Sequence, residues 1–243
     1  MPMLNVSALS KRFGALRAVH EVSFSVDEGE ILGLIGPNGS GKSTIFNCIA
    51  GLYAPDGGTI TFEGRDLTGL MPNRICHSGI GRTFQIPRPF RNLTLLENVE
   101  LAGFYGQGSH SRAKADEAAE KALAMVGLPT DRRAPVDGLG AAGLKKLELA
   151  KALATSPKLL LADESLGGLD EAEMDQAADM LRKIRDELGI TIIWVEHIMG
   201  VLMRVVDRVV VLDHGEVIFA GVPKDAQNDK RVVEVYLGSE AVA

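Results

Sequence analysis

The chain has 243 residues, 46% hydrophobic and 24% charged, a composition that excludes both a disordered protein and one embedded in a membrane. Its 26 basic and 32 acidic residues give a net charge of −6, so we expect no nucleic acid among its partners and membrane attachment only through other proteins. The two cysteines form no CxxC pair and the first residues contain no secretory signal, so we expect a reducing, cytoplasmic location without disulfides or zinc.

Two strands are expected near the N-terminus, over residues 3–9 and 18–26. In the second, the residues at every other position from Ala18 to Val26 form one face, and polar or small residues form the other. Residues 27–30 supply a turn. The apolar run 31–35 is typical of a strand buried on both faces, and it leads through a glycine-rich loop into a helix over residues 42–52.

Further along the chain, strands and helices alternate. Apolar runs predict strands at residues 159–162, 190–195 and 208–212, all far too short to cross a bilayer. Helices are predicted at residues 111–126, 144–155 and 170–188, the last from apolar residues recurring three and four apart. This order predicts an α/β fold with a mostly parallel sheet, in which residues 1–85 and 157–243 form the core and residues 86–156 an inserted helical subdomain.

The glycine-rich loop carries the strongest motif. The sequence fits GxxxxGK[ST] at Gly36, Pro37, Asn38, Gly39, Ser40, Gly41, Lys42 and Ser43, with Thr44 next. In such a loop the backbone amides surround the phosphates of a nucleotide, Lys42 reaches the β and γ phosphates, and Ser43 offers its hydroxyl to Mg²⁺. Thr44 is placed to bind a phosphate oxygen nearer the base. The alternative is a glycine-rich turn that binds nothing, but the preceding strand and following helix favour ATP with Mg²⁺.

A second acidic element follows the strand at residues 159–162, which ends in Asp163 and Glu164. We expect Asp163 on the metal side and Glu164 as the general base that polarises the attacking water. Two acids after a strand can also form an ordinary turn, and it is the phosphate loop that favours the catalytic interpretation.

The order of these motifs resembles that of ABC-type ATPase subunits over nearly the whole chain. The resemblance implies a P-loop NTPase core with N-terminal antiparallel strands. It also implies that Phe13 stacks on adenine beside Val19, and that Gln85 senses Mg²⁺ and the γ-phosphate and links the core to the helical subdomain. The alternative for Phe13 is an ordinary core position.

Two further residues have roles implied by the same resemblance. His197 resembles the switch histidine that contacts the γ-phosphate, although a histidine at a strand end is often structural. Asp170 resembles the residue of a loop that crosses a dimer interface, and with Glu173 it also fits a capping box at the start of a helix. Ser165 replaces the proline usual after the acidic pair, a departure that removes no catalytic group.

The main departure from the family lies in the signature motif. Where the family has Leu-Ser-Gly-Gly-Gln, this chain has Leu139, Gly140, Ala141, Ala142 and Gly143, which we call the signature segment. In the family this motif serves ATP held by the opposing subunit of a head-to-tail dimer. Losing one charge-assisted hydrogen bond costs about 1.5–3 kcal/mol, so we expect weak hydrolysis at the partner's site.

Residues 79–86 and 89–99, together with residues 235–238, resemble the ATPases of branched-chain amino acid importers. The resemblance implies an ATP-hydrolysing subunit at the cytoplasmic face of the inner membrane. Its implied partners are a second ABC ATPase, two transmembrane permeases seated near residues 85–104 and, indirectly, a periplasmic substrate-binding protein. The alternatives are a lipopolysaccharide-export ATPase, a non-transport ABC ATPase acting on DNA or ribosomes, and a regulatory subunit with one impaired site.

Overall fold

The computed structural model describes residues 2–106, 111–163, 170–196 and 199–240. The chain divides into two compact units, one made of Met1–Ile75 with Thr191–Ala243 and the other of Cys76–Ile190. This division differs from the predicted boundaries at residues 85, 86, 156 and 157. Two strands of the expected core, at residues 80–82 and 159–163, group with the helices, because they pair with each other and the first of them also contacts a helix of that unit.

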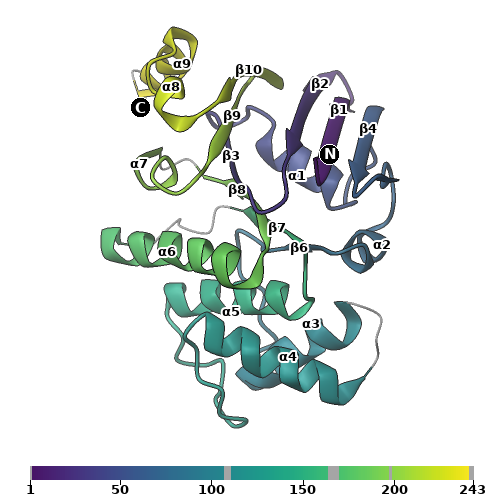
Figure 1. The fold of residues 1–243 in the computed structure, drawn as a ribbon, viewed down its shortest axis with the longest axis vertical. Coiled ribbons are helices and arrows are strands. Elements are labelled where there is room, and N and C mark those ends of the chain that lie inside the picture. Colours follow the sequence, from purple (N-terminus) through teal and green to yellow (C-terminus); the bar gives the residue numbers. More distant parts are fainter. Residues whose placement is uncertain (1, 107–110, 164–169, 197–198, 241–243) are drawn as a thin grey trace. The chain divides into compact units, whose positions relative to one another are not determined.

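In the part of the first unit that the structure describes, there are two β-sheets with helices around them (Figure 1). Its elements are β1 (Leu4–Phe13), β2 (Leu16–Val26), β3 (Ile31–Ile35), α1 (Lys42–Ile49), β4 (Gly57–Phe62), β5 (Arg65–Asp66), most of α2 (Pro72–His77), β8 (Thr191–Val195), α7 (Met199–Leu202), β9 (Arg208–Asp213), β10 (Glu216–Gly221), α8 (Pro223–Ala226) and α9 (Lys230–Glu240).

One sheet of this unit is antiparallel, with the strand order β2-β1-β4-β5. In the other, β3 lies between β8 and β9 and runs parallel to both, and β10 pairs antiparallel with β9. All five residues of β3 are buried, as the continuous apolar run predicted. A strand buried on both faces and flanked on both sides has its position fixed, so the loop at its carboxyl end starts from a rigid point.

The predicted alternation in β2 holds only in its second half. Val22, Phe24 and Val26 are buried, but Val19 is fully buried as well, whereas Ala18 and His20 are only half-buried. The reason is a backbone irregularity at Glu21, whose φ of 50° is left-handed and which lies beside a register shift in the pairing with β1. One extra residue reverses which side chains face the core, so the period-2 pattern cannot continue through it.

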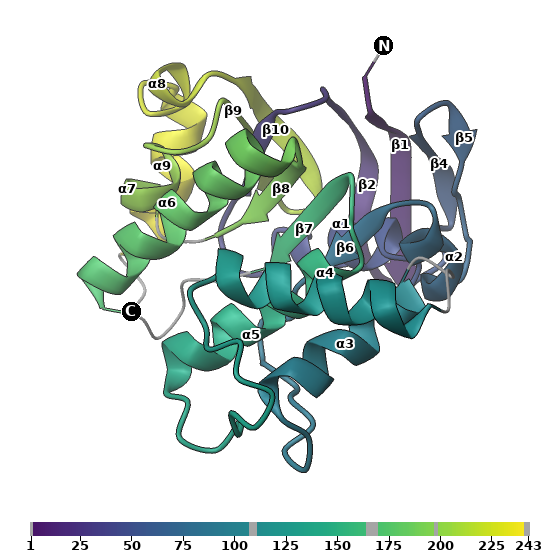
Figure 2. The same cartoon turned by 60° about the horizontal axis from the view of Figure 1, so that its bottom comes forward.

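Within its described residues, the second unit combines a pair of strands with four helices. Its elements are β6 (Ile80–Arg82), α3 (Leu95–Gly106), α4 (Arg112–Met125), α5 (Ala141–Ala154), β7 (Leu159–Asp163) and α6 (Glu171–Leu188). Strands β6 and β7 are parallel, and α3, α4 and α5 pack against one another (Figure 2). On α6 the centre of the predicted stripe is buried, at Ala178, Leu181 and Ile184, whereas Leu188 at its end is 49% exposed.

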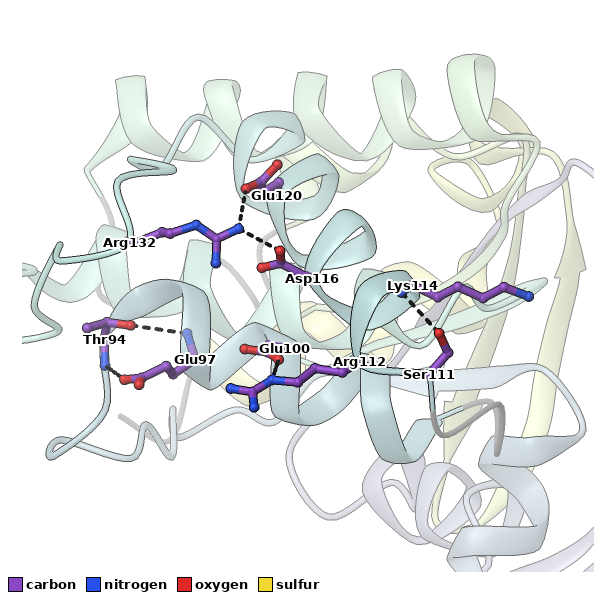
Figure 3. A network of polar contacts seen from close by, with 9 residues as sticks. All are labelled: Thr94, Glu97, Glu100, Ser111, Arg112, Lys114, Asp116, Glu120 and Arg132. Carbon is purple, nitrogen blue, oxygen red and sulfur yellow. Dashed lines mark hydrogen bonds and ion pairs between the residues drawn. The ribbon is translucent and has the colours of Figure 1, made fainter.

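Polar contacts lie at the N-terminal ends and on the surface of α3 and α4, as Figure 3 shows. Thr94 and Glu97 bond each other's backbone N–H groups at 2.8 and 3.2 Å, a capping box that starts α3. The Ser111 hydroxyl accepts from the Lys114 N–H at the start of α4. Arg132 pairs with Asp116 at 2.5 Å and with Glu120 at 3.2 Å. Each such exposed ion pair contributes little to the free energy of unfolding, so these pairs orient surface side chains rather than stabilise the core.

The strands predicted at residues 159–162, 190–195 and 208–212 are present as β7, β8 and β9, each within one residue at either end. Helix α3 was not predicted, and β4 and β10 were also missed. In the described part of the chain, no helix is long and apolar enough to span a bilayer. Cys48 and Cys76 are both free thiols, and burial raises the pKa of Cys48 to about 11.

Candidate functional site

The phosphate loop, residues 36–44, connects the carboxyl end of β3 to the start of α1 in the first unit. Two of its glycines occupy positions that no other residue fits. Gly36 has a φ of 149°, and a Cβ there would lie 2.2 Å from the carbonyl oxygen of Leu212. Gly41 has a φ of 104°, and its Cβ would lie 2.7 Å from the carbonyl oxygen of Ala18. The neighbouring backbones therefore require glycine at both positions.

The start of α1 is shaped to receive an anion. Gly41 is the N-cap residue and provides no side-chain hydrogen bond to the helix. The first-turn N–H groups of a helix without a capping side chain need an outside acceptor, and the helix dipole favours a negative one. The Lys42 ammonium lies inside the loop, donating to the carbonyls of Gly36 at 2.8 Å and Pro37 at 2.9 Å. Ser43 is exposed and Thr44 half-buried, so both hydroxyls are near the surface of the loop.

Helix α9 lies close to the phosphate loop, a feature the sequence did not predict. A cavity of about 350 Å³ is lined by loop residues 37–40, by Asp213 and His214, and by Glu234 and Val235 of α9. Burial raises the pKa of Tyr236 to about 12, and a hydrogen bond from the Gly36 backbone acts in the opposite direction. Tyr236 of α9 therefore contacts the first residue of the loop. The Gly215 N–H also donates to the Ser40 carbonyl at 3.1 Å.

Phe13 and Val19, the residues expected near adenine, have different environments. Phe13 is 42% exposed, which removes the alternative of an ordinary core position. Its ring meets Tyr53 edge to face at 5.2 Å, and the Lys11 ammonium lies 5.6 Å from its centroid. An exposed aromatic face is what stacking on a base requires. Val19 is fully buried and lies beside Gly41, so it supports the loop from within.

In the second unit, Asp163 ends β7 and is 7% exposed. Its N–H donates to the Thr83 hydroxyl at 3.1 Å, and its Oδ2 accepts from Arg82 Nη2 at 2.8 Å. Gln85 follows β6, and Asp163 is the last residue of β7. Since the two strands are parallel, both residues lie at the carboxyl ends of the strands. Gln85 and Asp163 both line a cavity of about 430 Å³ together with residues of α5 and α6. The structure thus brings these two predicted residues together.

The signature segment leads into α5, which begins at Ala141 rather than at residue 144 as predicted. Gly140 is the N-cap of α5, with an extended backbone and a φ of −70°. A Cβ at Gly140 would have no neighbour within 4 Å, whereas one at Gly143 would lie 2.9 Å from Leu139 Cδ2. The missing serine therefore corresponds to a capping position. A serine there would face the same helix N-terminus that an anion would approach.

A buried carboxylate on α5 anchors the segment that follows Gln85, and sequence reasoning missed it. Glu148 is 4% exposed, and its Oε1 accepts from the Arg88 N–H at 2.7 Å and from Lys151 Nζ at 2.8 Å. Lys151 also donates to the Arg88 carbonyl at 3.0 Å. Its position between Leu147 and Leu149 does not indicate this burial, because a glutamate in a helix is usually exposed.

Asp170 forms the predicted capping box of α6. Its carboxylate accepts from the Glu173 N–H at 2.8 Å, and the Glu173 carboxylate accepts from the Asp170 N–H at 3.1 Å. Glu164, Ser165 and His197 lie outside the described residues. Of the predicted groups, Lys42, Ser43 and Phe13 belong to the first unit, and Gln85, Asp163 and the signature segment belong to the second.

The chain is similar to known proteins in both sequence and fold. Residues 19–167 match the family model described as ABC transporter. The high-affinity branched-chain amino acid transport ATP-binding protein LivG of Salmonella typhimurium is 36% identical, over 98% of each chain. The protein of the same description from Pseudomonas aeruginosa, BraF, is 34% identical, again over 98% of each. A solved ATP-binding cassette of an ABC transporter in its ADP conformation has a TM-score of 0.88 and 32% identity, over 98% of this chain and 99% of that one.

Proposed function

Since the chain belongs to the ABC transporter family, we propose that it is the ATP-hydrolysing subunit of an importer for branched-chain amino acids or a related small hydrophobic or amide substrate. The observation that carries the ATPase part is the phosphate loop, with its buried ammonium and two obligatory glycines. The importer and its substrate class are supported by the named relatives, which match over almost their whole length.

Nucleotide binding follows from the chain's own groups. The first-turn amides of α1 and the Lys42 ammonium bind the phosphates, and Thr44 binds a phosphate oxygen nearer the base. Phe13 stacks on adenine through its exposed face. In this proposal Lys42 exchanges the carbonyl oxygens of Gly36 and Pro37 for phosphate oxygens, which gives the ammonium a charged partner.

Three side chains supply the oxygen donors proposed for the metal. The hydroxyl of Ser43, the amide of Gln85 and the carboxylate of Asp163 are hard oxygen donors of the kind that Mg²⁺ prefers, so the residues fit this ion. When bound, Mg²⁺ would neutralise charge on the β and γ phosphates. Glu164 would orient and deprotonate the attacking water, and His197 would contact the γ-phosphate. These roles are proposals that follow from the family order of motifs.

The proposed complex contains a second ABC ATPase, two permeases and, indirectly, a periplasmic binding protein, with this chain at the cytoplasmic face of the inner membrane. Asp170 would lie on the loop that faces the second ATPase, and the signature segment would face that subunit's nucleotide. Three side chains near Gln85 support a permease contact, since Phe84, Ile86 and Phe90 are 40%, 72% and 51% exposed. Adjacent exposed apolar side chains of this size mark an interaction surface.

The proposal can be tested by uptake in cells whose only copy of the chain carries Lys42→Ala. We expect the initial rate of labelled leucine, isoleucine and valine uptake to fall by about 100-fold. The reason is that Lys42 supplies the only buried ammonium among the described residues of the loop, and phosphate binding depends on it. Lys224→Ala, which removes an exposed lysine of α8, is the matched control and should transport normally. Unchanged uptake in Lys42→Ala cells, with the protein present, would remove the transport assignment.

A second experiment separates an active subunit from a regulatory one, the candidate that the altered signature segment favours. Glu164→Gln should leave ATP binding intact and abolish turnover at this chain's own site in the purified complex. Turnover equal to that of the unchanged complex would overturn the general-base role of Glu164. A nucleotide-dependent regulatory subunit would then be the alternative.

A further inference from the structure

An ion pair connects the proposed metal carboxylate to an arginine that has no assigned role. Arg82 ends β6, and its Nη2 donates to Asp163 Oδ2 at 2.8 Å. The side chains of Arg82 and Asp163 are 12% and 9% exposed. The parallel register pairs Arg82 with Leu161, and the Thr83 N–H donates to the Leu161 carbonyl at 3.0 Å. The two strands therefore hold this pair in place as a fixed feature of the second unit.

Burial makes this pair different from the surface pairs of the helices. A charge-assisted bond of this length between nearly buried groups is strong, and each partner alone would be an uncompensated buried charge. A divalent cation that binds the Asp163 carboxylate must either share it with the guanidinium or displace it. In the first case two positive charges lie a few ångströms apart, and in the second Arg82 loses its partner. Both effects lower the affinity for the cation.

We propose that Arg82 is a positioning residue that weakens divalent-metal binding at Asp163 and so keeps the nucleotide's metal exchangeable. This inference rests on the proposed role of Asp163 as a metal ligand. Arg82 binds one carboxylate oxygen of Asp163, so the metal must compete with the guanidinium for this carboxylate. The consequence is that metal affinity depends on where the guanidinium lies.

The other contact of Arg82 is with an exposed aromatic ring. Its guanidinium carbon lies 5.4 Å from the centroid of Phe84, which is 40% exposed and precedes Gln85. Arg88 approaches the same ring at 5.6 Å, and no bond between its side chain and a carboxylate is seen in the described residues. Arg88 offers a matched control, since it shares the ring contact without the ion pair.

The experiment measures Mn²⁺ binding by electron paramagnetic resonance, with the full chain and a non-hydrolysable ATP analogue. Arg82→Gln should lower the Mn²⁺ dissociation constant by about tenfold, because the competing charge is gone. Arg82→Lys keeps the charge and should stay within about threefold of the unchanged chain. Arg88→Gln should change nothing. Binding of the analogue in the presence of EDTA should be equal for all variants, which separates metal affinity from nucleotide affinity.

Asp163→Asn tests the metal role of Asp163 separately from the role of Arg82. If it leaves Mn²⁺ binding unchanged, the assignment of Asp163 as a metal ligand is wrong and the role of Arg82 falls with it. If Asp163→Asn weakens Mn²⁺ while Arg82→Gln leaves it unchanged or weaker, only the inference about Arg82 is overturned. Should Arg82→Gln fail to fold, Arg82→Met preserves the length and the contact with Phe84, and the same tenfold tightening is expected of it.

Discussion

The phosphate loop and the signature segment are both glycine-containing turns that lead into a helix, yet their surroundings differ. At Gly36 and Gly41 the neighbouring backbone lies within 3 Å of where a side chain would begin, and both residues have positive φ. At Gly140 nothing lies within 4 Å and φ is −70°. The loop requires Gly36 and Gly41, whereas the signature segment only tolerates Gly140. The residue at position 140 can therefore change without any cost to the fold.

The largest effect is expected from placing an alanine in each turn. Gly41→Ala should weaken ATP binding by about 100-fold, because an alanine at this φ is strained by up to about 3 kcal/mol and also meets the Ala18 carbonyl. Gly140→Ala should leave binding by the isolated chain within about twofold. A fluorescent ATP analogue titrated against each variant gives both constants, and circular dichroism confirms folding. Equal affinities for the two variants would show that the two turns do not differ in their need for glycine.

The next effect concerns the helix that carries the signature segment. Glu148→Ala leaves Lys151 and the Arg88 N–H without their shared acceptor, which should lower the free energy of unfolding by about 3 kcal/mol. Urea unfolding followed by circular dichroism measures this difference. The control is Glu117→Ala on α4, since Glu117 pairs with Lys121 at 2.6 Å on the surface and its loss should be barely measurable. Similar losses for both variants would mean that burial of Glu148 adds nothing.

Repair of the signature segment should produce a smaller change, in the opposite direction. Gly140→Ser with Gly143→Gln should raise ATP turnover of a homodimer by about tenfold, from one regained charge-assisted hydrogen bond. Gly140→Ser alone should give most of the gain, because its side chain enters open space, whereas a side chain at position 143 must displace Leu139. Steady-state phosphate release measures both. Turnover that stays at the level of the unchanged chain would show that the altered signature segment does not limit ATP hydrolysis.

The smallest effect is expected from the contact between α9 and the phosphate loop. Burial raises the pKa of Tyr236 to about 12, so the folded chain holds the phenol proton more tightly than the unfolded chain. The contribution of Tyr236 to the free energy of unfolding is fully present below pH 10 and is lost as the pH rises toward 12. At pH 10.5 the loss is less than about 1 kcal/mol. Tyr236→Phe should show a smaller decline in urea midpoint between pH 9 and 10.5 than the unchanged chain. An equal decline of the urea midpoint in the variant and the unchanged chain would show that the Tyr236 phenol is exposed to water in the folded chain.

Much of the site could be predicted because its signal is local. The phosphate loop is continuous in sequence, and β3 before it is buried on both faces, so a single apolar run identifies it. The capping box at Asp170 spans four residues and forms as predicted. By contrast, the pattern in β2 failed at Glu21, because a bulge depends on the partner strand and leaves no trace in a period of two.

Arg82 and Glu148 were beyond sequence reasoning for a related reason. Arg82 and Asp163 are separated by 81 positions, and only the parallel pairing of β6 with β7 brings the guanidinium to the carboxylate. Glu148 and Arg88 are 60 positions apart, and packing of α5 buries the glutamate that joins them. Local pattern determined the family of the fold, the nucleotide loop and the altered signature segment. Tertiary structure alone decided which buried charges meet, because a charge far along the chain becomes a partner only when folding removes the water between them.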